Sequence, residues 1–369
     1  MDRRLLCLLT LILLALSACA GEVETMAQPA TEEATTSPTA TALPTATPEL
    51  PTTTPELPTP TVSPPTATPA PPTPTPMPVE MISEVPYIDD GAWEHLSTVY
   101  LPAEADGPFP TVVIYHSGAF WHGNYSEEPA YGELSRFFAS RGYAVVVPSY
   151  RLSQTDPYPA AVEDAFCAVS WVHEAAAQYG FDVAHIATLG FEAGANLAAL
   201  IGTVDEPQRF LAGCPHQLPD EALVQAVVAI GGYYDLSAIF VGMNPDFQNQ
   251  IQKYITAYLE ASPEEAPERY AEASPITWVD GSEPPFAIVY NRNESWFKFR
   301  AHGLAFADAL VAAGVKVQTV ESSLNFFPVF PMAGEECAYF HNGQCELVLA
   351  DYGIPQAEAF LRDLFTTGE

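Results

Sequence analysis

Residues 110–121 decide the fold, and they read Pro-Thr-Val-Val-Ile-Tyr-His-Ser-Gly-Ala-Phe-Trp. A short apolar run rich in β-branched residues that stops at small and polar ones is typical of a buried strand ending in a loop. Similar runs recur along the chain. Together they predict strands at Thr111–Tyr115, Tyr143–Pro148, His185–Leu189, Gln225–Ile230, Phe286–Asn291 and Lys316–Val320.

Amphipathic stretches between these runs predict helices, at Ala130–Arg141, Ala160–Tyr179, Ala195–Gly202, Phe299–Ala313 and Gln356–Phe365. Strands and helices in alternation favour an α/β fold, a three-layer α/β/α sandwich around a mostly parallel sheet. Right-handed crossovers then gather the loops after the strands along one rim, where ligands bind in open sheets. Residues 235–275 contain a helical pattern at Asn249–Ala261 but no strand pattern, so we expect a small cap insertion over that rim.

The opening stretch resembles the strand and His-Gly-Gly loop of esterases in the α/β-hydrolase superfamily. Residues 141–146, 149–152 and 158–165 resemble the next strand, the Tyr-Arg-Leu turn and the helix that follow in that family. The groups it resembles are the hormone-sensitive-lipase-like, feruloyl-esterase-like and kynurenine-formamidase-like carboxylesterases. The resemblance covers most of residues 95–365 and implies the α/β-hydrolase fold.

The catalytic positions implied by this resemblance are altered. Where the family has Gly-x-Ser-x-Gly on a tight strand-to-helix turn, this chain has Gly190-Phe191-Glu192-Ala193-Gly194, so Glu192 replaces the nucleophilic serine. Glu294 stands at the position of the acid. Asn325 stands at the position of the histidine, and an amide cannot act as a general base near neutral pH.

The oxyanion hole of the family uses backbone N–H groups, which survive changes of side chain. The resemblance places these donors at Ser117, Gly118 and Ala193. We expect the Glu192 carboxylate to fold into or near this hole, held ionised by the donors and the helix dipole.

Other residues of the predicted rim could bind a ligand or supply a base. His116, Trp121 and Tyr125 are expected to line the binding site, with further aromatics nearby. A replacement histidine could come from His116, His122, His302 or His341. For three of them the simpler interpretation is structural: His116 belongs to its loop, His302 is exposed on a helix, and His341 is a loop residue.

Three functional hypotheses follow. The first is a catalytically inactive member of the esterase fold that binds a small ester, aryl or carbohydrate ligand outside the cell. The alternative is an active carboxylic-ester hydrolase with a rearranged or carboxylate-based site. The third is a structural lipoprotein without a ligand. No cofactor or metal is expected, because no Cys-x-x-Cys or His-x-x-x-His spacing occurs.

The cysteines suggest disulfides in an exported domain. Beyond Cys7 and Cys19, the four cysteines of the domain permit three pairings. We favour Cys167–Cys214, and Cys337–Cys345 closing a short loop.

The amino terminus predicts export and a lipid anchor. Two arginines precede the apolar run Leu5–Ala18, which is shorter than the about 20 residues that cross a membrane and is typical of a signal peptide. Its end, Leu16-Ser17-Ala18-Cys19, resembles the lipobox of bacterial lipoproteins, in which the cysteine is lipidated. We therefore expect an exported protein, lipid-anchored to the outer face of the cell membrane or envelope, with the membrane as a partner.

Residues 20–80 are rich in Pro, Thr, Ala and Glu and predict a disordered linker between this signal, residues 1–19, and the domain at 81–369. The chain is strongly acidic, with 46 Asp and Glu against 13 Lys and Arg. This charge repels phosphate backbones, so nucleic acid is not an expected partner.

The anchor is tested by Cys19→Ser in the full chain. We expect the variant to lose incorporation of labelled palmitate and to leave the membrane fraction, because stable anchoring needs at least two acyl chains. Cys7→Ser, inside the predicted signal, is the matched control and should stay labelled. A Cys19→Ser protein that is still acylated and membrane-bound would refute the anchor.

Overall fold

The computed structural model describes residues 76–124, 129–219, 222–293, 298–322, 349 and 352–367. All of them belong to one compact unit, Ala70–Glu369. The predicted anchor and most of the predicted linker lie outside the described residues, as do Tyr125, Glu294, Asn325, His341, Cys337 and Cys345. Residues 76–80 of the predicted linker are described, and the first strand begins there at Val79. Among the described helices, none is both long and apolar enough to cross a bilayer.

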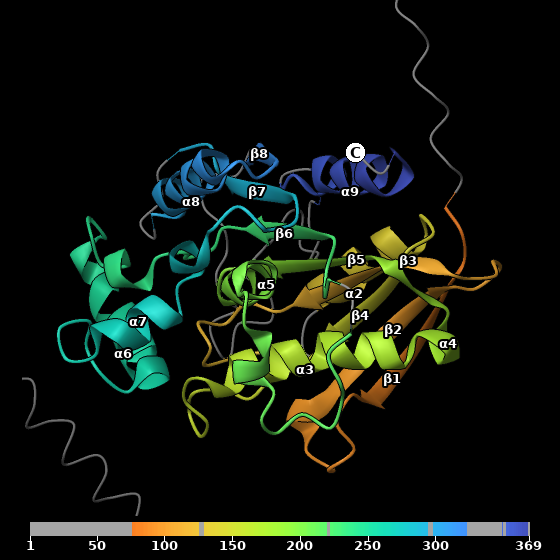
Figure 1. Cartoon of the computed structure of the whole chain (residues 1–369), viewed down its shortest axis with the longest axis horizontal. Helices are drawn as coiled ribbons and strands as arrows, with labels where there is room; N and C mark the ends of the chain where they lie inside the picture. Colours follow the sequence, from red (N-terminus) through yellow and green to blue (C-terminus); the bar gives the residue numbers. More distant parts are fainter. Residues whose placement is uncertain are drawn as a thin grey trace, which may run out of the picture. The chain divides into compact units, whose positions relative to one another are not determined.

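The described part of the chain contains one eight-stranded sheet in the order β1-β2-β4-β3-β5-β6-β7-β8 (Figure 1). Pairing is antiparallel between β1, β2 and β4 and parallel from β4 through β8. The strands are β1 Val79–Pro86, β2 Leu96–Pro102, β3 Phe109–Tyr115, β4 Ala144–Pro148, β5 Phe181–Phe191, β6 Ala226–Ile230, β7 Phe286–Asn291 and β8 Val317–Ser322.

Helices flank this sheet and complete the three-layer α/β/α sandwich that the sequence predicts. They are α2 Pro129–Ala139, α3 Ala160–Glu174, α4 Ala176–Tyr179, α5 Ala193–Thr203, α6 Pro245–Leu259, α7 Pro267–Glu272, α8 Phe299–Ala313 and α9 Ile354–Thr367. Short 3₁₀ turns lie at η1 Trp93–His95, η2 Pro207–Phe210, η3 Leu236–Ala238 and η4 Pro275–Trp278. The fold expectation is confirmed.

Two details differ from the predictions. Strands β1 and β2 are not among the predicted strands. Strand β1 is exposed along most of its length and carries no clear strand pattern, whereas β2 is mostly buried. The single helix predicted at Ala160–Tyr179 is two, since Ala175 has a ψ of 1° and interrupts the helix between α3 and α4.

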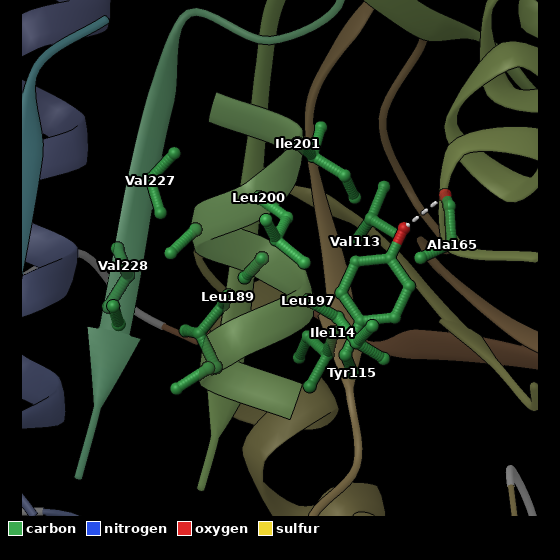
Figure 2. Packing of buried hydrophobic residues seen from close by; sticks show 14 of the residues in the cluster. Val113, Ile114, Tyr115, Ala165, Leu189, Leu197, Leu200, Ile201, Val227 and Val228 are labelled. Carbon is green, nitrogen blue, oxygen red and sulfur yellow. Dashed lines mark hydrogen bonds between the residues drawn. The ribbon is translucent and has the colours of Figure 1, made fainter. Parts of the chain in front are cut away.

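The core forms where α5 packs on the central strands (Figure 2). Leu197 and Leu200 of α5 lie beside Leu189 of β5, and Ile201 lies beside Val113 of β3, all buried. Burying apolar side chains of this size is worth about 1.5–3 kcal/mol each. This packing fixes the start of α5, and with it the turn between β5 and α5.

The segment between β6 and β7 contains helices and no strand, as the sequence indicates, and its main helix is α6. Helix α6 lies against the loop after β3: Tyr258 stacks on Phe120 with ring centroids 3.8 Å apart, and Tyr254 contacts Trp121 at 5.5 Å. These rings bring the segment to the carboxyl-terminal rim of the parallel strands. In Figure 1, α6 and α7 lie together at the left.

A disulfide joins Cys167 in α3 to Cys214 in the loop after η2, which confirms the first predicted pair. The two cysteines are 47 residues apart. Closing a loop of that length removes entropy from the unfolded chain.

We expect the Cys167→Ala/Cys214→Ala double variant to lose about 4 kcal/mol of unfolding free energy, in the chain-entropy account of a loop of this length. Urea unfolding of the oxidised proteins measures the loss. Reduced wild-type protein is the control and should unfold near the double variant. Equal stability of oxidised wild type and double variant would contradict the expectation.

Candidate active site

The turn at Glu192 connects β5 directly to α5, and its backbone is strained. Glu192 has φ 53° and ψ −107°, a region that residues other than glycine rarely adopt. A Cβ on Gly190 would lie 2.0 Å from the Gly194 oxygen, and one on Gly194 would lie 2.2 Å from the Tyr115 oxygen. Only glycine fits at these two positions, so the surrounding backbone fixes the direction of the residue 192 side chain.

The Glu192 side chain points into the loop after β3. Its Oε2 accepts hydrogen bonds from the backbone N–H groups of Gly118 at 3.1 Å and Ala119 at 2.8 Å. The backbone N–H of Ala193 also bonds the carboxyl group. Glu192 is 4% exposed. The carboxyl group therefore lies against the donors that bind an oxyanion in an esterase.

The expected donor set needs one correction. Ser117 does not donate to Glu192, because its N–H bonds the Tyr131 hydroxyl at 2.7 Å. Ala119 takes its place. The chain reverses sharply here, with φ of 129° at Gly118, 51° at Ala119 and 60° at Phe120. In this reversal the N–H groups of Gly118 and Ala119 point toward Glu192.

Neighbouring residues hold this strained loop in position. Ser153 donates both its N–H and its hydroxyl to the Phe120 carbonyl, at 2.8 and 2.9 Å. Nearby, the Arg151 guanidinium pairs with the buried Asp164 of α3 at 2.7 Å. A residue in an unfavourable region costs about 1–3 kcal/mol and persists only where such contacts determine it.

Burial raises the pKa of Glu192 above its ordinary value, although the N–H groups of Ala119, Ala193 and Gly118 act in the opposite direction. The expectation that the donors hold this carboxyl ionised is therefore not supported. Desolvation of the charged form outweighs the three donors.

His116 is a structural residue of its loop. Its Nδ1 lies 2.7 Å from the Ser117 carbonyl, which only accepts, so Nδ1 carries the proton. The ring stacks on Tyr150 at 4.0 Å, and burial lowers the pKa of His116 to about 4. An imidazole this buried stays neutral near pH 7.

His302 was expected to be exposed on a helix, and this is wrong. It is 8% exposed, burial lowers its pKa to about 4, and it meets the edge of Tyr233 with ring centroids 5.1 Å apart. Tyr233 is itself buried, and its hydroxyl has no hydrogen-bond partner among the described residues. Glu192 lies close enough to raise the pKa of Tyr233 further, beyond the larger effect of burial.

An aromatic and a cationic side chain meet at the described rim. Trp121 is partly buried and lies beneath Lys253, whose Nζ is 5.7 Å from the ring centroid. Within the described ranges, no group of three histidine, cysteine or acidic side chains is arranged to hold a metal ion.

The protonation of Glu192 predicts how stability depends on pH. A carboxyl whose pKa is raised on folding contributes stability that is complete below its unfolded pKa and is lost as the pH rises through the folded pKa. Glutamine keeps an accepting oxygen and cannot ionise. We therefore expect Glu192→Gln to gain stability over wild type as the pH rises from 4 to 8, each kcal/mol raising Tm by roughly 2–4 °C.

Thermal unfolding across this pH range measures the difference. Glu358→Gln is the control. Glu358 is buried and pairs with Arg362 at 2.7 Å, so losing this ion pair should destabilise the protein near pH 7. If Glu192→Gln also proved less stable than wild type near pH 7, the carboxyl would be held ionised after all.

Known proteins resemble this chain in sequence and structure. The family model described as BD-FAE matches residues 98–300, more than half of the chain. The probable carboxylic ester hydrolase LipM of Mycobacterium tuberculosis is 26% identical over 213 residues, covering 58% of this chain and 48% of LipM. The carboxylesterase NlhH of the same organism is 29% identical over 258 residues, covering 67% of this chain and 76% of NlhH.

Solved structures agree. The thermophilic carboxylesterase EstE1, cloned from a metagenomic library, superposes with a TM-score of 0.52 at 26% identity, covering 67% of this chain and 79% of EstE1. The chain spans about half the length of LipM. With the family model matched over most of the sheet and its turn at Glu192, the chain belongs to the BD-FAE family of esterase-like α/β-hydrolases.

Proposed function

We propose that this protein is a lipid-tethered, extracytoplasmic module of the esterase fold that binds a ligand without hydrolysing esters. The observation that carries the proposal is the Glu192 carboxyl, which accepts from Gly118 and Ala119 at 3.1 and 2.8 Å. An ester substrate would need these same donors for its developing oxyanion.

Ester hydrolysis in this fold needs a nucleophile, a free oxyanion hole and a base. Glu192 removes the hydroxyl nucleophile and occupies the hole. Two of the imidazoles considered as bases, His116 and His302, are buried with pKa values lowered to about 4. Asn325, at the expected histidine position, offers no base. All three requirements therefore count against turnover.

A second candidate is an active carboxylic-ester hydrolase with a carboxylate-based site. Relatives that are named esterases favour it, and so does the buried Tyr233 hydroxyl beside Glu192, which has no partner in the described chain. This candidate needs Glu192 to leave the oxyanion hole before it can attack.

The tether completes the proposal. A signal peptide, lipidation at Cys19 and a proline-rich linker would hold the domain outside the cell, with the membrane as its partner. At about 3.1 Å per residue, some 60 extended residues would reach up to roughly 180 Å. The acidic composition suits an exposed surface and disfavours nucleic acid as a partner. The ligand class at the rim is a small ester, an aryl group or a carbohydrate.

Hydrolysis of p-nitrophenyl acetate and butyrate tests the proposal. We expect no turnover above buffer for wild type or Glu192→Gln. Glu192→Ser alone should stay near background, whereas Glu192→Ser/Asn325→His should exceed it by at least about 10²-fold, a usual contribution of a general base. The double variant should also react with a fluorophosphonate probe.

Sustained turnover by wild type that Glu192→Gln abolishes would overturn the proposal and establish the carboxylate-based hydrolase. Turnover that is identical in wild type and Glu192→Gln would be assigned to contaminating esterase.

A further inference from the structure

A groove lies between the start of α3, η2, α7 and η4. It is open to solvent and has a volume of about 790 Å³, within the range of about 300–1,000 Å³ usual for ligand pockets. Its lining includes Tyr158, Arg209, Phe210, Arg269, Glu272 and Trp278, and neither Glu192 nor its donors. The groove is therefore a separate site.

Aromatic rings form one part of the lining and are fixed in place. Phe210 is 3% exposed and stacks on Phe166 with centroids 5.5 Å apart. Tyr158 meets the edge of Phe210. The indole N–H of Trp278 donates to the Glu272 carbonyl at 2.9 Å. Rigid aromatic surfaces offer large apolar contact at little entropic cost, and the C–H faces of sugar rings pack on such surfaces.

An ion pair forms the polar part. Arg209 pairs with Glu272, and its guanidinium lies 5.3 Å from the Trp278 ring centroid. Both charged side chains remain partly exposed, at 45% and 30%. The Tyr158 hydroxyl is buried and lies close to Glu272, whose charge raises the pKa of Tyr158 further, beyond the larger effect of burial.

The charges that line the groove favour an uncharged ligand. Two arginines and two glutamates line it, so it is balanced within a chain of net charge −33. An anionic ligand would compete with Glu272 for Arg209, and a cationic ligand would compete with Arg209 for Glu272. A hydroxyl group both donates and accepts, so a polyhydroxyl ligand can accept from Arg209 and donate to Glu272 together.

We propose that this groove binds a neutral oligosaccharide, with Trp278 and Tyr158 contacting the sugar faces and Arg209 and Glu272 bonding the hydroxyls. The groove would give the tethered domain a carbohydrate contact of its own. This inference does not depend on whether Glu192 supports turnover, which the nitrophenyl ester assay decides separately.

Titration calorimetry of the full chain with neutral hexasaccharides of xylose, glucose and mannose tests the site. We expect at least one to bind with a Kd between high micromolar and millimolar. Trp278→Ala should weaken binding by roughly tenfold or more, as for an aromatic contact at the centre of a site. Trp93→Ala is the matched control, because Trp93 is 44% exposed and lies outside the groove, and it should bind like wild type.

Arg209→Gln gives a second measurement if Trp278→Ala fails to fold, since Arg209 is nearly half exposed. It should also weaken binding, with circular dichroism confirming the fold. The proposal is overturned if none of the three sugars binds at millimolar concentration, or if binding is unchanged in the folded groove variants. Loss of binding in Glu192→Gln with binding intact in Trp278→Ala would place the sugar at the β5–α5 turn instead, and would likewise overturn it.

Discussion

The rest of the site depends on the backbone of the turn at Glu192. Gly190 and Gly194 leave no room for a side chain, and the packing of α5 on β5 and β6 forces the helix to start one residue after Glu192. A residue with φ 53° at this point must project its side chain toward the loop after β3. The architecture of an esterase is therefore retained while the chemistry is left to whichever residue occupies position 192.

The length of the side chain decides what it does there. A serine hydroxyl is one bond beyond Cβ, where it can attack a carbonyl carbon bound in front of it. A glutamate carboxyl is two methylene groups from Cα, so its oxygens extend past that point to the N–H groups of Gly118 and Ala119. Under the proposed function, the side chain would take the place of the substrate oxyanion rather than that of the nucleophile.

The central strands and the turn at Glu192 could be predicted from the sequence. The central strands are continuous Val- and Ile-rich runs because both of their faces are buried, and the glycine spacing at 190 and 194 marks the turn. Strand β1 was missed because it is exposed along most of its length. The sequence predicts Ser117 rather than Ala119 as a donor to the Glu192 carboxyl. The actual donors depend on a chain reversal at Ala119 and Phe120, and neither residue type indicates a positive φ. The burial of His302 comes from contact with Tyr233, which is distant in the sequence.

The direction of the pKa shift at Glu192 could not be predicted from the sequence. It depends on whether the effect of burial, which raises the pKa, exceeds the effect of the N–H donors, which lower it. Within the described part of the chain, the hydrogen bonds given for the Glu192 carboxyl come from backbone N–H groups, which carry partial charges. Burial that raises the pKa of Glu192 lowers the fraction of nucleophilic anion at any given pH. The burial that brings this carboxyl into the oxyanion hole therefore also weakens the carboxylate chemistry that could have replaced the missing serine.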